Sequence, residues 1–189
     1  MKKKLLLAAA VCSLTIGAAY ADTGYCSKGC GSYWLFGDSL SSDAGAWSSK
    51  VDFHINNVAQ AGSMITQSDI PRQVSCARRE VIYWLGTNDA GRGVEKVLYQ
   101  QALRDHMQFL EGRNCKVWMV LPVLVTLTPE HEQRTRDARQ WSKAVAKDYE
   151  NVTVLNAPYL TSETTDGVHP TDERQGIIAR WITKKLRGE

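Results

Sequence analysis

In the run SYWLFGDSL, residues 32–40, an apolar segment typical of a strand passes directly into a turn that carries a serine. Residues 32–36 are mostly aromatic and aliphatic, which is typical of a buried strand. Gly37 and Asp38 favour a tight turn, and Ser39 follows where the strand ends. Open parallel sheets bind ligands at the carboxyl ends of their strands, so Ser39 is a candidate nucleophile. Taken alone, these residues form an ordinary turn more often than a nucleophile site.

Short apolar runs alternate with longer amphipathic stretches along the rest of the chain, which is the pattern of a parallel sheet with crossover helices. The runs predict five strands, at 32–36, 54–59, 80–85, 116–121 and 152–156. The stretches between and after them predict helices at 41–50, 93–112, 129–149 and 172–186. We therefore expect one α/β domain, a three-layer α/β/α sandwich around a five-stranded parallel sheet.

The first 21 residues have the pattern of a secretory signal peptide. Three lysines after Met1 precede an apolar stretch, and Ala19-Tyr20-Ala21 is a small-residue pattern typical of a cleavage site. The apolar stretch is shorter than the roughly 20 residues that a membrane span needs, so no stable membrane insertion is expected. The expected organisation is a signal peptide at 1–21 and an exported domain at 22–189, either periplasmic or secreted.

Removal of the signal peptide also changes the charge of the protein. The whole chain has a formal net charge of +3, and the first 21 residues contain three lysines and no acidic residue. The remaining domain is therefore close to neutral. Nothing in it predicts the clustered basic face of a nucleic-acid-binding protein.

Four cysteines lie beyond the signal peptide, an even number that predicts disulfides in an oxidising compartment. We favour Cys26–Cys30 and Cys76–Cys115 among the three possible pairings. Cys76 and Cys115 shortly precede two runs that are expected to form neighbouring strands. Zinc binding is the alternative, although Cys-x3-Cys without a nearby histidine is a weak ligand set.

Two further motifs follow predicted strands and so fall on the same rim as Ser39. Gly86-Thr87-Asn88-Asp89 follows the third strand, and the neutral amide of Asn88 can donate to an oxyanion without a change of protonation. The second strand leads to Gly62, where a glycine lets a backbone N–H approach a ligand closely. Each motif taken alone is equally compatible with a turn.

The segment Asp166-Gly-Val-His169-Pro170 lies between the fifth strand and the last helix. Its spacing lets the carboxylate of Asp166 reach one imidazole nitrogen of His169 while the other nitrogen faces a nucleophile. A carboxylate in this position fixes the histidine tautomer and stabilises the imidazolium that forms when the base takes a proton. The alternative is a turn capped by Asp166, with His169 packed beside Pro170.

Together these motifs resemble the SGNH hydrolase superfamily, also called the GDSL-like lipase and esterase family. The family is defined by short sequence blocks. The first block is similar to residues 37–40, the second to 57–62, the third to 86–89 and the fifth to 166–170. The resemblance covers nearly the whole domain and implies a flavodoxin-like α/β/α sandwich. It implies that Ser39 is the nucleophile, His169 the base and Asp166 its partner. The oxyanion hole would consist of the Ser39 amide, the Gly62 amide and the Asn88 side chain.

The resemblance implies an exported serine esterase that works through an acyl-enzyme, without a cofactor or metal. The expected substrate is a small-molecule or glycan ester. The small size of the domain and its lack of an inserted lid favour short-acyl, especially acetyl, esters on carbohydrate. A lysophospholipase or thioesterase for longer acyl chains, an O-acyltransferase and a non-catalytic glycan-binding module are the alternatives. No oligomeric state is predicted.

Several other residues are candidates for a catalytic or substrate-binding role. Asp38 and Asp89 form a possible glycosidase carboxylate pair, which the serine and its own base make unnecessary. Trp47 and the apolar side chains of the segment 122–130 are candidates for the wall of the substrate site. Burial in the core is the alternative for both.

Overall fold

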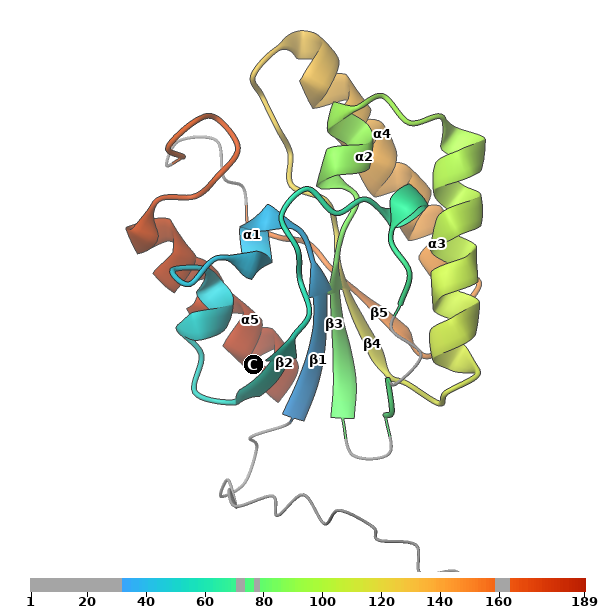
Figure 1. Cartoon of the computed structure of the whole chain (residues 1–189), viewed down its shortest axis with the longest axis vertical. Helices are drawn as coiled ribbons and strands as arrows, with labels where there is room; N and C mark the ends of the chain where they lie inside the picture. The colour runs from blue at the N-terminus through green and yellow to red at the C-terminus, as the bar shows by residue number, and fades with distance from the viewer. Residues whose placement is uncertain (1–31, 71–73, 77–78, 159–163) are drawn as a thin grey trace, which may run out of the picture.

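The computed structural model describes residues 32–70, 74–76, 79–158 and 164–189, and its centre is a parallel five-stranded sheet. The strand order is β2-β1-β3-β4-β5, and every pair of neighbours is parallel (Figure 1). This order is that of flavodoxin-like sheets, as the sequence predicts. The strands are β1 (Ser32–Gly37), β2 (His54–Asn57), β3 (Arg79–Trp84), β4 (Val117–Val120) and β5 (Val152–Leu155).

The longer helices begin and end close to their predicted limits. Thr128 caps one helix by accepting a hydrogen bond from the His131 amide, and Thr171 caps another through the Arg174 amide. The α-helices are α1 (Ser39–Ser42), α2 (Thr87–Gly91), α3 (Lys96–Glu111), α4 (Pro129–Ala146) and α5 (Asp172–Arg187). Two 3-10 turns are η1 (Trp47–Ser49) and η2 (Ile65–Gln67).

The predicted helix at 41–50 is wrong. The structure has only the single turn of α1, an irregular stretch and then η1. Serine, aspartate and glycine fill most of this segment, and their side chains compete for local backbone groups. Ser49 Oγ donates to the carbonyl of Ala46 at 2.8 Å, and Ser48 Oγ donates to that of Ser41 at 3.1 Å.

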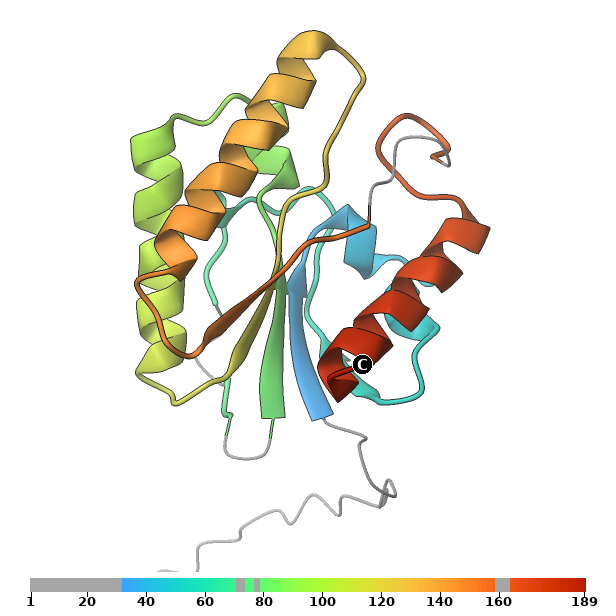
Figure 2. The ribbon, with the colours of Figure 1, turned by 180° about the vertical axis from the view of Figure 1, so that it is seen from behind.

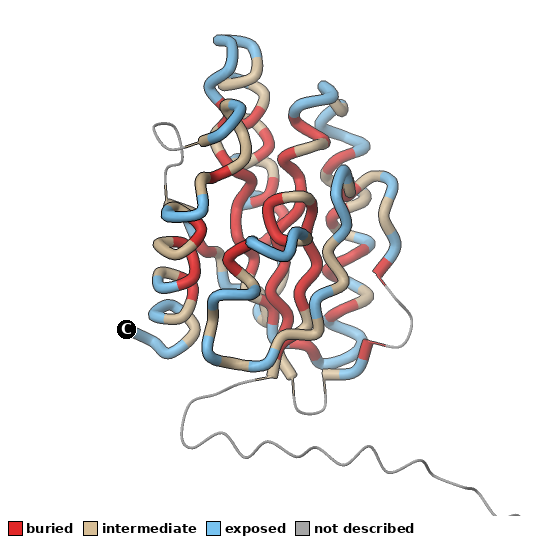
Figure 3. Tube along the Cα trace, turned by 60° about the vertical axis from the view of Figure 1, so that its left-hand side comes forward, coloured by how far each residue is buried: buried red, intermediate tan, exposed pale blue. Residues whose placement is uncertain are grey.

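Helices pack on both faces of the sheet, which gives the predicted three layers (Figures 1 and 2). On one face, side chains of α3 and α4 pack against strand residues such as Tyr83 and Met119. On the other face, α5 packs with Leu40 and Trp47 against strand residues such as Leu35. The central strands and the inner sides of the helices are buried (Figure 3), and this buried frame holds the strand ends in place.

Cys76 and Cys115 form a disulfide, as predicted, with their Cα atoms 5.0 Å apart. It links the segments that lead into β3 and β4, which are neighbours in the sheet. Such a link stabilises the fold mainly by restricting the unfolded chain. The predicted Cys26–Cys30 pair and the signal peptide lie outside the described residues.

Candidate active site

Ser39 is the first residue of α1, directly after the carboxyl end of β1. Asp38 caps this short helix, since its Oδ1 accepts a hydrogen bond from the Leu40 amide at 3.0 Å. The first amides of a helix have no partner within the helix, so they face whatever lies beyond its start. The turn therefore presents the hydroxyl of Ser39 together with backbone donors.

His169 is held by its own local segment. Asp166 Oδ1 accepts hydrogen bonds from the amides of Val168 and His169, at 3.0 and 2.8 Å. Its other oxygen, Oδ2, lies 2.7 Å from His169 Nδ1. These bonds, led by the one from the His169 amide, lower the pKa of Asp166 to about 2, which keeps the carboxylate charged.

The structure brings the serine and the histidine together. His169 Nε2 lies 2.8 Å from Ser39 Oγ, although the two residues are 130 positions apart in the chain. The contact joins α1, at the end of β1, to the loop before α5, on the upper edge of the sheet in Figure 1. The result is a continuous chain of hydrogen-bonding groups from Asp166 through His169 to Ser39, which is the arrangement that an activated serine nucleophile requires.

Asn88 and Gly62 belong to neighbouring loops. Asn88, in α2, donates from Nδ2 to the carbonyl of Ser63 at 3.0 Å, directly beside Gly62 in the chain. A side-chain amide has two N–H donors, so this bond leaves one for a ligand. Gly62 is exposed and has a φ of +78°, a conformation that favours glycine. The loop is tied to the nucleophile turn through Gln60 N and the carbonyl of Gly37, at 3.1 Å.

Asp89 has a structural role that its position in the motif does not reveal. It is fully buried, and its two oxygens accept hydrogen bonds from Ile65 N, Thr66 N and Thr66 Oγ1 at 2.8, 3.1 and 2.9 Å. These bonds anchor the loop that follows Gly62. Asp38 is buried as well, so neither carboxylate is exposed as a glycosidase would require.

Asp38 is the most unusual titratable group at the site. It is 1% exposed, and its Oδ2 has no hydrogen-bond partner among the described residues. Burial raises the pKa of Asp38 to about 7, and nearby Asp89 adds to this, while the bond from the Leu40 amide and the charge of His169 oppose it. The carboxyl directly before Ser39 therefore changes charge near neutral pH.

The raised pKa of Asp38 predicts a pH-dependent stability. The folded state holds the proton more tightly than the unfolded state, whose Asp38 has an ordinary pKa. The contribution of Asp38 to stability is thus complete below the unfolded pKa and is lost as the pH rises through the folded value. We expect Asp38→Asn to gain stability relative to the wild type between pH 5 and 8, by up to about 3 kcal/mol. Urea unfolding at both pH values measures this, with exposed Asp43→Asn as control, and parallel stability curves would contradict it.

The loop that carries His169 requires a glycine at position 167. Its φ is +86°, in the left-handed region, and a Cβ added there would overlap the side chain of Leu127. Leu127 belongs to the loop after β4, so the two loops pack closely at this point. The glycine lets the chain turn so that Asp166 can bond back to His169.

We expect Gly167→Ala to lower the kcat of any reaction that uses Ser39 and His169 by about 100-fold, because a small displacement of His169 spoils its alignment with the serine. Gly176→Ala is the matched control, since the added methyl group would lie 3.6 Å from Arg180 Nη1. Adding Leu127→Ala to Gly167→Ala removes the overlap but not the backbone strain, so we expect partial recovery. Wild-type activity in Gly167→Ala would contradict this role.

Trp47 and the segment after β4 do not line an open apolar site. Trp47 is fully buried and packs against Trp84, with ring centroids 5.8 Å apart. Val123 and Val125 are also buried, while Leu127 is 52% exposed beside the histidine loop. Packing into the core is therefore the correct interpretation for most of these residues.

Neither a metal-ligand cluster nor a membrane-spanning helix is found in the ranges that the structure describes. No group of three or more histidine, cysteine or acidic side chains among these residues is arranged to hold a metal ion. No helix in the same ranges is long and apolar enough to cross a membrane.

Solved structures with the same fold include GDSL-family lipolytic proteins and esterases. A protein assigned to the lipolytic G-D-S-L family from Desulfitobacterium hafniense superposes with a TM-score of 0.68 and 16% identity, over 81% of this chain and 98% of its own. Esterase EstA from Pseudoalteromonas, in a structure inhibited by monoethylphosphonate, gives 0.64 and 15%, over 83% and 97%. The acetylxylan esterase Axe2 from Geobacillus stearothermophilus gives 0.64 and 15%, over 84% and 96%.

No protein-family model and no curated protein sequence matches the chain. The similarity is thus one of structure, at low sequence identity. The chain has the three-layer α/β fold of the GDSL proteins, and the predicted resemblance to them is confirmed at the level of the fold.

Proposed function

We propose that this protein is a serine esterase that hydrolyses carboxylic esters through an acyl-enzyme. The observation that carries the proposal is the aligned set of contacts from Asp166 to His169 at 2.7 Å and from His169 to Ser39 at 2.8 Å. Proteins with the same fold include esterases, which supports the same chemistry.

In the proposed reaction, Ser39 Oγ attacks the ester carbonyl while His169 Nε2 takes the hydroxyl proton. His169 then gives this proton to the departing alcohol, which leaves the acyl group on Ser39. Water attacks the acyl-enzyme with His169 again as base, the acid is released, and Ser39 regains its hydroxyl. Asp166 keeps Nδ1 protonated and stabilises the positive charge that His169 carries between these steps.

The oxyanion of each tetrahedral intermediate is proposed to bind three donors, the amides of Ser39 and Gly62 and the side-chain amide of Asn88. The free N–H of Asn88 and the exposure of Gly62 support this assignment. Donors of this kind are held in position before the reaction, so they stabilise the charge as it develops.

For the substrate we propose a short-acyl, especially acetyl, ester on a carbohydrate. Burial of Val123 and Val125 leaves only Leu124 and Leu127 as accessible apolar side chains in the loop after β4, which offers little apolar surface to a long acyl chain. An acetylxylan esterase shares the fold, which supports an acetyl ester as the substrate. We also propose that residues 1–21 direct export, with which the Cys76–Cys115 disulfide is compatible.

The test is labelling with a fluorophosphonate probe, followed by peptide mapping and assays with p-nitrophenyl esters of increasing chain length. We expect one label per protein, on the peptide that contains Ser39, and faster turnover of acetate than of long-chain esters. Protein unfolded in urea is the control and should not react. If the native protein neither reacts with the probe nor hydrolyses any ester, the proposed function is wrong. Equal or faster turnover of long chains would instead favour a lipid substrate.

A further inference from the structure

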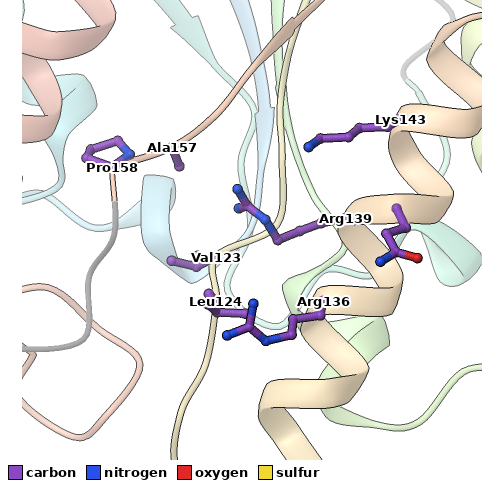
Figure 4. A pocket seen from close by; sticks show the side chains of 8 residues that line it. Val123, Leu124, Arg136, Arg139, Lys143, Ala157 and Pro158 are labelled. Atoms are coloured by element: carbon purple, nitrogen blue, oxygen red, sulfur yellow. The ribbon is translucent and has the colours of Figure 1, made fainter.

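A cavity of about 370 Å³ lies beside α4, between that helix and the segments that leave β4 and β5 (Figure 4). Arg136, Arg139, Gln140 and Lys143 line it from the helix, at the spacing that puts side chains on one helical face. Across from them lie Val123 and Leu124, which follow β4, and Ala157 and Pro158, which follow β5. In Figure 4 the three cationic side chains extend from α4 toward these two segments.

The charged side chains that line this cavity are all positive. Three of its eight lining residues are cationic and none is acidic. Glu132 compensates Arg136 through an ion pair at 2.5 Å within α4, while Lys143 has no ion pair with a described residue. Burial lowers the pKa of Arg139, and repulsion from Arg136 lowers it further, which indicates that these two cations lie close together.

Structural roles account for only part of this arrangement. Arg139 Nη1 donates to the carbonyl of Pro122 at 2.6 Å and so fixes the loop after β4. Arg136 donates hydrogen bonds from Nε and Nη2 to the Glu132 carboxylate. Neither role requires the exposed Lys143, one helical turn beyond Arg139, to face the same cavity. Like charges gathered around one hollow repel each other unless a bound anion offsets them.

The cavity lies on the same rim as the serine and the histidine. Val123 N donates to Thr87 Oγ1 at 3.2 Å, and Thr87 directly precedes Asn88. Val123 belongs to the same buried apolar cluster as Leu40, and Ala157 and Val168 pack against this cluster. Leu40 and Val168 directly neighbour Ser39 and His169 in the chain. One wall of the cavity is therefore built on the same packed unit as the candidate active site.

We propose that this cavity, lined by Arg136, Arg139 and Lys143, is a subsite for an anionic group, a carboxylate or a phosphate, carried by the ester substrate. The inference rests on the proposed esterase function and adds a preference for acidic over neutral esters. Arginine forks bind both groups through paired hydrogen bonds, and lysine adds a mobile point charge.

Two matched pairs of acetyl esters test the proposal and separate the two anions. The carboxylate pair is an O-acetylated methyl glucuronoside and its neutral methyl ester. The phosphate pair is 1-acetylglycerol 3-phosphate and neutral 1-acetylglycerol. We expect the wild type to prefer the acidic member of at least one pair in kcat/KM, and the preferred pair identifies the anion. The preference should shrink as salt concentration rises.

The double variant Arg136→Gln/Lys143→Gln removes two of the charges and spares Arg139, which holds the loop. We expect the acidic-to-neutral ratio of kcat/KM to fall about tenfold or more, since bonds to charged groups are lost. Lys147→Gln is the matched control, because it removes a charge one turn further along the helix and outside the cavity. The control should keep the wild-type ratio. An unchanged ratio in the double variant, or an equal loss in the control, overturns the proposal.

A direct binding measurement keeps this inference distinct from the proposed function. Calorimetric titration of the Ser39→Ala protein with unacetylated methyl glucuronoside and with glycerol 3-phosphate requires no catalysis. Saturable binding of either anion that the double variant abolishes supports the subsite even if no ester is hydrolysed. If neutral esters are hydrolysed but neither anion binds, the esterase stands and the subsite is wrong.

Discussion

If the proposed reaction is correct, a Ser39→Ala variant is expected to lose about six orders of magnitude in kcat for ester hydrolysis, as removal of the triad nucleophile does in subtilisin. The proposed reaction has no other group in line with His169, whose Nε2 lies 2.8 Å from Ser39 Oγ. Release of p-nitrophenol from a short-acyl ester measures the effect. The loss should be confined to catalysis, because the hydroxyl is half-buried at a helix start and packs into no core cluster.

Ser42→Ala is the matched control, since it removes a hydroxyl from the same short helix without touching the histidine. It should retain wild-type kcat. If Ser39→Ala also retained activity, the hydrolysis would come from elsewhere, and a binding module that keeps this fold would become the better explanation.

An Asp166→Asn variant is expected to lose about four orders of magnitude in kcat while its fold is unchanged. The amide oxygen of asparagine can still accept the backbone bonds from Val168 and His169. The amide nitrogen then faces His169 Nδ1 in place of Oδ2, and this nitrogen can donate a hydrogen bond but cannot accept one. The imidazole is forced to carry its proton on Nε2, so it cannot take the proton of Ser39.

The pH profile of kcat and the thermal unfolding temperature together test this tautomer argument. A protein that unfolds at the wild-type temperature but has lost its activity fits a wrong tautomer. Asp148→Asn, which replaces an exposed carboxylate 3.7 Å from Arg104, is the control and should keep full activity. Activity within tenfold of the wild type in Asp166→Asn would show that another group orients His169.

Local pattern was enough to predict most of the fold. Each predicted strand overlaps an observed one. The central strands are recognised easily because they are buried and form continuous apolar runs, whereas the edge strand β2 contains no buried residue. The prediction failed at 41–50, where serine side chains bond to nearby carbonyls and no regular apolar face exists. The short α2 was predicted only as a turn motif, since five residues are too few to show helical periodicity.

In the candidate site, too, contacts between residues close in the chain could be predicted from the sequence, and contacts between distant segments could not. Asp166 and His169 are three residues apart, so their bond lies within the reach of one turn and could be predicted from spacing. The burial of Asp38 and the anchoring by Asp89 could not be predicted, because both depend on segments far away in the sequence. The same is true of the cationic cavity beside α4, whose walls come from three separate parts of the chain.

The sequence by itself therefore determined the alternation of strands and helices, the turn that carries Ser39 and the self-contained Asp166–His169 pair. It did so because hydrophobic periodicity, turn chemistry and short-range hydrogen bonds act between residues that are close in the chain. Only the tertiary structure placed His169 against Ser39 across 130 positions, buried Asp38 deeply enough to raise its pKa to about 7, and gathered three cations around one cavity. Distances between remote segments, and the loss of water around a charge, arise only when the sheet and its helices pack together.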